Sequence, residues 1–315
     1  MGRGIALAFA AAGHKVVLVD AKERPDDAAK ELERAALDEI ASDLSFLVSL
    51  AVINQSEADA ALQRISFACR SQCAEALQRA DLVFEGVPEV LEAKRECFAF
   101  LSEHVQPDCI IASTSSTIDP DSLAPLVAHP DRFLNAHWLN PAFLMPLVEL
   151  SPALATSDNA IDQLRQILSL IGKVPVTCKG AGYIIPRIQA LAMNEAARMV
   201  EEGVASAEDI DTAIRVGFGP RFSVLGLLEF IDWGGGDILH YASDYLGKQI
   251  DRDRYIAPQI IGENMKHRRR GLRDGAGFYD YRNIDVEAYR SQRLADFVSL
   301  LKVRDLMPKF KSQLP

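Results

Sequence analysis

The first half of the chain alternates between short apolar runs and longer segments whose apolar residues recur at helical spacing. The apolar runs predict buried strands, because parallel strands covered on both faces are apolar along their whole length. The expected strands are residues 15–19, 65–68, 81–88, 109–113, 133–137 and 147–150, and the expected helices are residues 4–12, 26–50 and 92–104. This alternation predicts an α/β fold built on a doubly wound parallel sheet. Ligands of such sheets bind outside the carboxyl ends of the strands.

After Cys178 the pattern changes to helices alone. Residues 186–203 keep helical spacing behind Pro186, a residue that suits the first turn of a helix. Ser206 to Asp209 resembles a capping box that opens a helix through Ile214. Further helical stretches are residues 225–230, 238–246 and 290–301. We therefore expect two domains, residues 1–180 with the sheet and residues 181–315 with helices only.

Composition narrows the class of protein and of partner. The chain has 315 residues, 49% of them hydrophobic and 25% charged, as in globular proteins. The net charge of −10 argues against non-specific binding to nucleic acid or to acidic membranes. Five scattered cysteines indicate a reducing compartment, so we expect a cytoplasmic protein without a metal site. The apolar run at residues 5–12 leads directly into a strand, so we expect a helix there rather than a secretion signal.

The segment from residue 133 to residue 150 carries candidate chemistry. His137 is followed by Asn140 and, twelve residues after the histidine, by Glu149 in an otherwise apolar run. A charge among apolar neighbours is costly to bury without a partner. A carboxylate paired with a histidine fixes its tautomer and stabilises its protonated form, so such a pair can remove a proton from an alcohol. The alternative is a core histidine and an unrelated surface glutamate.

Residues 1–20 have the features of the second half of a dinucleotide-binding motif of the Rossmann fold. In that motif a strand is followed by a glycine-rich turn, a helix, a second strand and an acidic residue. Gly2 takes the place of the third glycine, and Asp20 takes the place of the acid that accepts the ribose hydroxyls. An aspartate there favours NAD over NADP, because it repels the extra phosphate. The alternative is a tightly packed helix of small residues.

The first strand and the first two glycines of this motif are not in the sequence. The first strand is central in this fold, so without it the neighbouring strands are expected to stay unpaired. We expect the natural protein to begin about ten residues upstream, or the sequence to be a fragment.

With these pieces in order, the chain resembles the 3-hydroxyacyl-CoA dehydrogenase family from Met1 to about Tyr281. The matching segments are Met1-Gly-Arg-Gly-Ile-Ala, Glu85-Gly-Val-Pro-Glu89 with Lys94, Ser113-Thr-Ser-Ser116, His137-x-x-Asn140-Pro with Glu149, Glu208-Asp-Ile-Asp-Thr-Ala213 and Gly275-Ala-Gly-Phe-Tyr-Asp-Tyr281. Their combination and order are specific, whereas each alone is weak.

The resemblance implies a role for each matching residue. His137 would be the general base that removes the hydroxyl proton while a hydride passes to NAD. Glu149 would orient His137, Ser115 would hydrogen-bond the reacting oxygen, and Asn140 would position the same region. The cofactor-contacting residues would be Gly2, Asp20, Glu89 and Lys94. The implied activity is NAD-dependent oxidation of a 3-hydroxyacyl-CoA, such as 3-hydroxybutyryl-CoA, to the 3-oxo form, by a homodimer.

Two departures from the family pattern leave the substrate open. Pro186 stands where the acyl-CoA enzymes usually carry an asparagine that reaches the active site. Arg221, in Gly217-Phe-Gly-Pro-Arg221, is closer to the carnitine and gulonate dehydrogenase (lambda-crystallin) branch. Its guanidinium would clamp a substrate carboxylate in a bidentate fork, and the alternative is a solvated surface arginine. Two further readings are therefore a dehydrogenase of a small free hydroxy acid and a non-catalytic NAD-binding structural protein.

Overall fold

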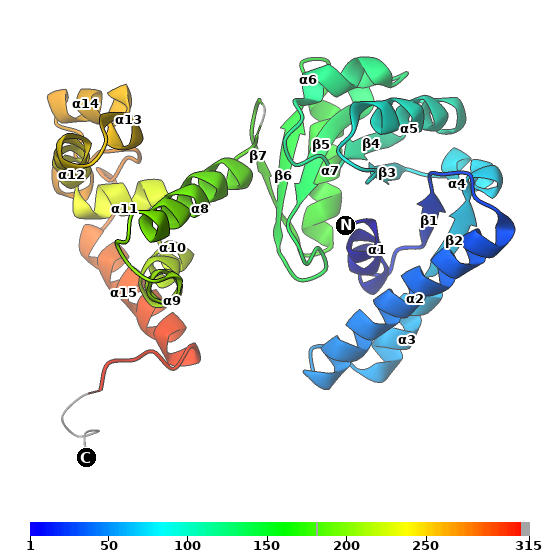
Figure 1. Cartoon of the computed structure of the whole chain (residues 1–315), viewed down its shortest axis with the longest axis horizontal. Helices are drawn as coiled ribbons and strands as arrows, with labels where there is room; N and C mark the ends of the chain where they lie inside the picture. Colours follow the sequence, from blue (N-terminus) through cyan, green and yellow to red (C-terminus); the bar gives the residue numbers. More distant parts are fainter. Residues whose placement is uncertain (181, 310–315) are drawn as a thin grey trace. The chain divides into compact units, whose positions relative to one another are not determined.

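The structure is a computed structural model that describes residues 1–180 and 182–309, and it divides into two units (Figure 1). The first unit is Met1–Met193, and the second begins at Asn194. The domain boundary that the sequence indicates at residue 180 stays a prediction. Helix α8, Ile185–Glu201, contributes residues to both units.

The first unit is the predicted α/β domain. Its strands are β1 Val16–Asp20, β2 Ile65–Cys69, β3 Leu82–Glu85, β4 Ile110–Ser113, β5 Phe133–Trp138, β6 Leu147–Pro152 and β7 Val174–Thr177. Its helices are α1 Gly2–Ala11, α2 Asp26–Ser49, α3 Gln55–Gln63, α4 Ala74–Gln78, α5 Leu91–His104, α6 Pro120–Leu123 and α7 Asp158–Leu170, with short 3₁₀ turns at Arg70–Gln72, Ala124–Leu126 and Pro130–Arg132. The Rossmann-type fold class is therefore confirmed.

The strands of the described residues form two separate sheets. One has the order β1-β2, and the other has the order β3-β4-β5-β6-β7. Strands β1 and β3 do not pair with each other within the described residues, as the sequence predicts for a chain that carries no strand between them.

Strand β6 runs against its neighbour β5, which differs from the expected all-parallel sheet. The pairs β1·β2, β3·β4, β4·β5 and β6·β7 are parallel, whereas β5·β6 is antiparallel. The reason is the short connection between β5 and β6, because parallel strands need a crossover of a dozen or more residues. The antiparallel pairing places His137 directly opposite Glu149.

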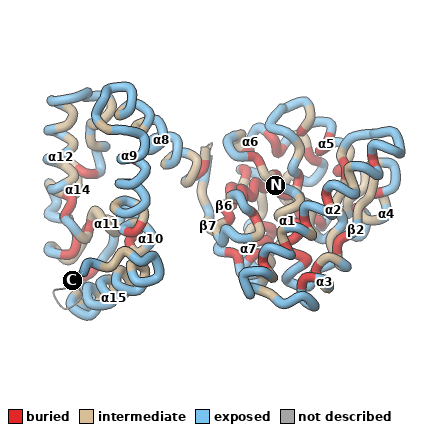
Figure 2. Tube along the Cα trace, turned by 60° about the horizontal axis from the view of Figure 1, so that its bottom comes forward, coloured by how far each residue is buried: buried red, intermediate tan, exposed pale blue. Residues whose placement is uncertain are grey.

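Helices cover both faces of the larger sheet, so the edge formed by the carboxyl ends of β3, β4 and β5 is the one left for a ligand. Residues of α1 and α7 pack with β4, β5 and β6 in one core cluster, which includes Ile5, Phe9 and Trp138. Residues of α4, α5 and α6 pack with β4 and β5 in a second cluster on Phe98 and Phe133. Figure 2 shows these buried residues concentrated in the first unit.

The second unit is helical, as predicted. Its elements after α8 are α9 Ala207–Ala213, the π-helical turn η4 Ile214–Phe218, α10 Gly219–Val224, α11 Leu227–Gly234, α12 Gly236–Gln249, α13 Arg252–Tyr255, α14 Gln259–Lys266, a 3₁₀ turn Leu272–Asp274 and α15 Val286–Val303. The expected cap is present, because the Ser206 side chain accepts a hydrogen bond from the Asp209 amide. None of the helices in the described ranges is both long and apolar enough to cross a bilayer.

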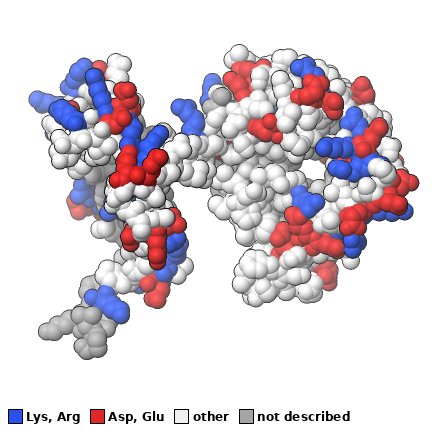
Figure 3. All heavy atoms as spheres, in the orientation of Figure 1, with Lys and Arg blue, Asp and Glu red and all other residues white. Residues whose placement is uncertain are grey.

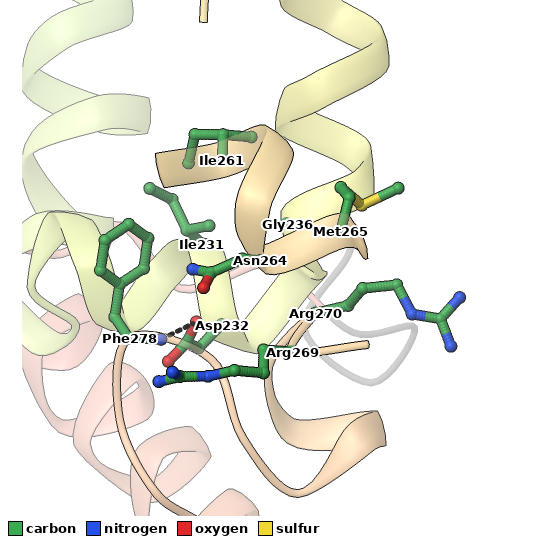
Figure 4. Close-up of a pocket in the computed structure, with 9 residues that line it drawn as sticks. All are labelled: Ile231, Asp232, Gly236, Ile261, Asn264, Met265, Arg269, Arg270 and Phe278. Carbon is green, nitrogen blue, oxygen red and sulfur yellow. Dashed lines mark hydrogen bonds between the residues drawn. The ribbon is translucent and has the colours of Figure 1, made fainter. Parts of the chain in front are cut away.

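One buried carboxylate in α11 fixes the Gly275–Tyr281 motif. The Asp232 carboxylate accepts a hydrogen bond from the Phe278 amide (Figure 4). It also accepts from the Tyr279 amide and from the Tyr281 hydroxyl. A Cβ atom added at Gly277 would lie 2.0 Å from Oδ1 of this aspartate. The motif therefore needs glycine at position 277 because the carboxylate occupies the space of a side chain.

Candidate active site

His137 and Glu149 form a hydrogen-bonded pair at the end of β5. His137 Nδ1 lies 2.8 Å from Glu149 Oε2, and the two residues are cross-strand partners in the β5·β6 ladder. His137 is 6% exposed and Glu149 is fully buried. Because the carboxylate accepts a hydrogen bond, Nδ1 carries the proton and Nε2 is left as the proton acceptor.

The second oxygen of Glu149 is held by the backbone at the start of α8. The amides of Ile184 and Ile185 donate to Oε1 at 2.8 and 2.9 Å. A carboxylate at a helix N-terminus is stabilised by the free amides and the helix dipole. Burial raises the pKa of the nearby Cys178 thiol, and the negative charge of Glu149 raises it further. Glu149 is thus fully buried, yet both of its oxygens have partners.

Tyr183 covers the His137 ring, a contact that the sequence did not indicate. The two ring centroids are 5.7 Å apart with an interplanar angle of 27°. The Tyr183 hydroxyl donates to the carbonyl oxygen of Ile118 at 2.8 Å. Burial holds the pKa of this phenol well above its usual value.

Lys94 is fully buried, and its main partner is Glu85 rather than Glu89. Its Nζ lies 3.1 and 3.0 Å from the two Glu85 oxygens, but 3.7 Å from Glu89. The Ser113 hydroxyl also donates to Glu85, at 2.7 Å. Glu85 did not enter the predicted site, although its place at the end of the apolar run 82–84 was a usable signal.

Ser115 and Glu89 are brought together by the loop that follows β4. The Ser115 hydroxyl donates to Glu89 Oε1 at 2.5 Å and accepts from the Ile118 amide at 3.0 Å. Burial by itself raises the pKa of the Glu89 carboxyl, but Ser115, the Lys94 charge and the Thr117 and Ser116 amides outweigh it and lower that pKa. Ser115 is therefore hydrogen-bonded to Glu89, one of the cofactor-contacting residues predicted from the sequence.

The residues around the ends of β1 and β3 fit a dinucleotide. Helix α1 starts at Gly2 without a side-chain cap, and a Cβ added at Gly86, just past β3, would lie 4.0 Å from the Gly2 nitrogen. Uncapped amides beside a strand end suit a pyrophosphate. Asp20 ends β1 as expected, but its carboxylate already accepts from Arg24 Nε at 2.6 Å and from the Lys22 amide at 3.1 Å. The hydroxyl groups of a bound ribose would share the Asp20 carboxylate with Arg24 and the Lys22 amide.

Asn140 and Arg221 are not part of this cluster of hydrogen bonds. Asn140 is exposed in the turn between β5 and β6, a turn whose carbonyl groups at Ala142 and Met145 accept from the buried Lys173 ammonium. Burial lowers the pKa of Lys173. Arg221 lies in α10 of the second unit, exposed, with its guanidinium 5.8 Å from the Phe230 ring centroid.

Comparisons with known proteins agree with the fold. Residues 1–181 match the model for the 3-hydroxyacyl-CoA dehydrogenase NAD binding domain, and residues 182–281 match that for the C-terminal domain of the same enzymes.

The chain is similar to the mitochondrial hydroxyacyl-coenzyme A dehydrogenase of Sus scrofa, with 32% identity over 90% of this chain and 88% of that protein. It is 28% identical, over 73% of its length and 74% of that protein, to 5-formyl-3-hydroxy-2-methylpyridine 4-carboxylate 5-dehydrogenase of Mesorhizobium japonicum. Among solved structures, the 3-hydroxyacyl-CoA dehydrogenase of Archaeoglobus fulgidus matches with a TM-score of 0.75 and 31% identity, covering 98% of this chain and 96% of that one. The chain belongs to the 3-hydroxyacyl-CoA dehydrogenase family, whose members are NAD-dependent oxidoreductases that act on CH–OH groups.

Proposed function

We propose that the protein oxidises a 3-hydroxyacyl-CoA, such as 3-hydroxybutyryl-CoA, to the 3-oxo form, with the His137–Glu149 pair as the base. The observation that carries this proposal is the 2.8 Å contact between His137 Nδ1 and a fully buried Glu149 carboxylate. It leaves Nε2 to take the hydroxyl proton, and positioned proton transfer of this kind contributes about 10²–10⁴-fold to a rate.

Bound NAD would supply the acceptor for the hydride that leaves the carbinol carbon. The residues that would hold it are Gly2 at the start of α1, Asp20 at the end of β1, and Glu89 with Lys94 beside the β3 end. Glu149 stabilises the imidazolium that forms as His137 takes the proton, while the Ile184 and Ile185 amides hold the carboxylate in place. In the proposed roles, Ser115 orients the reacting oxygen and Asn140 positions the substrate.

The experiment is the substitution His137→Gln, with NADH binding measured by fluorescence titration and turnover measured on 3-hydroxybutyryl-CoA. We expect turnover to fall at least about a hundredfold while NADH affinity is kept, because only the base is removed. His129→Gln is the matched control, since the His129 side chain is exposed in the loop before β5, within the first unit. Nearly unchanged turnover of the His137 variant would refute the assigned role.

A second candidate function is oxidation of a small free hydroxy acid. Arg221 favours it, because the guanidinium is exposed and forms no ion pair within the described residues. The relative from Mesorhizobium japonicum is named for a pyridine carboxylate, so the family includes a protein named for a carboxylate that is not a thioester. Turnover of acetoacetyl-CoA against that of free 3-oxo acids separates the two candidates. If Arg221→Met leaves the KM of a free acid unchanged, the carboxylate clamp is wrong.

We also propose a cytoplasmic homodimer in which residues 1–180 bind NAD and residues 181–315 bind substrate and the second copy. The free cysteines at positions 69, 73, 97, 109 and 178 support a reducing compartment. Acidic and basic side chains are interspersed on the visible face of each unit (Figure 3), and the net charge is negative, which supports a small-molecule substrate rather than nucleic acid or a membrane.

A further inference from the structure

Tyr183 has no role in the proposed mechanism, yet its segment contacts His137, Glu149 and the loop that carries Ser115. Its ring lies against the His137 imidazole, and the amides of the next two residues, Ile184 and Ile185, donate to Glu149. Its hydroxyl donates to the Ile118 carbonyl in the loop that carries Ser115. The side chain is only 3% exposed.

The backbone at Tyr183 shows that this placement is imposed by its surroundings. Its φ is +44°, in the left-handed region that a bulky residue rarely adopts. Gly182, directly before it, has φ +77°. Such a conformation persists only where neighbouring contacts over-determine it, and it is typical of functional sites.

A chain of hydrogen bonds joins the Tyr183 hydroxyl to the predicted cofactor residues. The Ile118 residue that accepts from Tyr183 donates its own amide to the Ser115 hydroxyl, and Ser115 donates to Glu89. The far end of the tyrosine ring is therefore fixed to the same loop that holds Ser115.

We propose that Tyr183 is a positioning residue that sets the plane of the His137 imidazole and its place relative to Ser115. One hydrogen bond to Glu149 fixes the distance and direction of Nδ1, but by itself it does not fix the tilt of the ring plane. A stacked aromatic ring limits this tilt. The Tyr183 hydroxyl then ties the stacked ring to the Ser115 loop, so that the base and the Ser115 hydroxyl keep one relative position. This inference rests on the proposed role of His137 as the base.

The test compares Tyr183→Phe, which keeps the ring, with Tyr183→Leu, which removes it. We expect Tyr183→Leu to lower kcat on 3-hydroxybutyryl-CoA about tenfold or more with KM changed less than about threefold, because small misplacements of a catalytic group cost up to about a hundredfold. Tyr183→Phe should restore part of kcat, because it keeps the stacked ring and loses only the hydrogen bond to the Ser115 loop. Circular dichroism melting checks that both variants fold.

A spectroscopic readout accompanies the kinetics. In proton NMR of the free protein, the His137 ring protons, assigned by their loss in His137→Gln, should be displaced by the ring current of Tyr183. The displacement should persist in Tyr183→Phe and vanish in Tyr183→Leu. Absence of this displacement in the unaltered protein overturns the proposal, even if Tyr183→Leu does not fold.

Equal turnover of folded Tyr183→Leu and the unaltered protein also overturns it, and so does an equal loss in the Phe and Leu variants, which would assign the effect to the hydroxyl alone. Failure of the base itself is a separate result. If His137 is not the base, the His137→Gln variant keeps its turnover. The NMR displacement of the His137 ring protons still decides, independently, whether Tyr183 orders the ring.

Discussion

Lys94 and Glu85 are charged residues with almost no solvent exposure, and each depends on the other. Lys94 is 0% exposed and Glu85 is 2% exposed, and Ser113 supplies a third contact. Removing one partner of a buried pair leaves an uncompensated charge, which costs about 3–5 kcal/mol. We expect Lys94→Met to lower the free energy of unfolding by about this amount, measured by urea denaturation.

The exposed pair Arg34–Glu31 on α2 is the control for this effect. Arg34→Ala should leave stability nearly unchanged, because solvent screens surface pairs. If the Lys94→Met and Arg34→Ala variants have the same free energy of unfolding, the Lys94–Glu85 contact does not stabilise the protein in solution.

At the residue scale, the sequence reveals charges in apolar runs but not contacts made by backbone or ring faces. Glu149 was visible because a carboxylate among Pro146, Leu147 and Leu150 requires a partner. The amides that hold its other oxygen carry no sequence signal, since every residue except proline has one. The stacking of Tyr183 on His137 was not predictable either, because it depends on a left-handed backbone at position 183.

Helix α11 and the Gly275–Tyr281 motif depend on the fit between Asp232 and Gly277. A side chain at position 277 would meet the Asp232 carboxylate, with Cβ 2.0 Å from Oδ1. We expect Gly277→Ala to lower the free energy of unfolding by about 2–3 kcal/mol, because the carboxylate must leave its three donors or the backbone must shift. Urea denaturation followed by circular dichroism measures this change.

Gly234, the last residue of α11, is the matched control. A Cβ there would meet only Ile238 Cδ1, at an ordinary 3.9 Å. Gly234→Ala should therefore leave stability unchanged or raise it slightly, since alanine favours a helix over glycine. A Gly277 variant as stable as the Gly234 variant would show that the carboxylate moves aside without cost.

Most elements with a strong apolar pattern were predicted from the sequence, but helix α7, whose buried Ala160, Leu164 and Leu168 recur at helical spacing, was not. Strands β4 and β5 are buried throughout and appear as apolar runs. Strand β7 was not predicted, because its ends are exposed and it contains Pro175. Helix α3 was also not predicted, although its capping box, Asn54 with Glu57, is a signal that sequence reading can use. The direction of β6 follows from the length of its connection, which the apolar pattern does not encode.

The two units bury apolar residues to very different degrees. The first unit has three core clusters around its sheets and helices. In the described part of the second unit, the buried hydrophobic residues are few: Ile210, Leu225, Ile261, Leu272 and Tyr281. Meanwhile several large apolar side chains of that unit are exposed. A helical unit with a small core and exposed apolar side chains gains stability when a partner covers them.

Helix α12 carries the apolar stripe on which the homodimer proposal can be tested. Ile238, Tyr241 and Tyr245 are 62%, 65% and 63% exposed, and their spacing places them on one face of the helix. We expect Tyr241→Glu to raise the dimer dissociation constant about tenfold or more, because a charge would be buried at the interface. Sedimentation equilibrium over a range of concentrations measures this constant.

Leu154→Glu is the control for added charge, since Leu154 is 94% exposed and lies in the first unit. It should leave the dissociation constant unchanged. A chain that stays monomeric at every concentration contradicts the homodimer itself. A dimer that Tyr241→Glu does not weaken contradicts only the α12 stripe as its surface, and it moves the interface to another exposed apolar set, such as Leu191 and Met193 on α8.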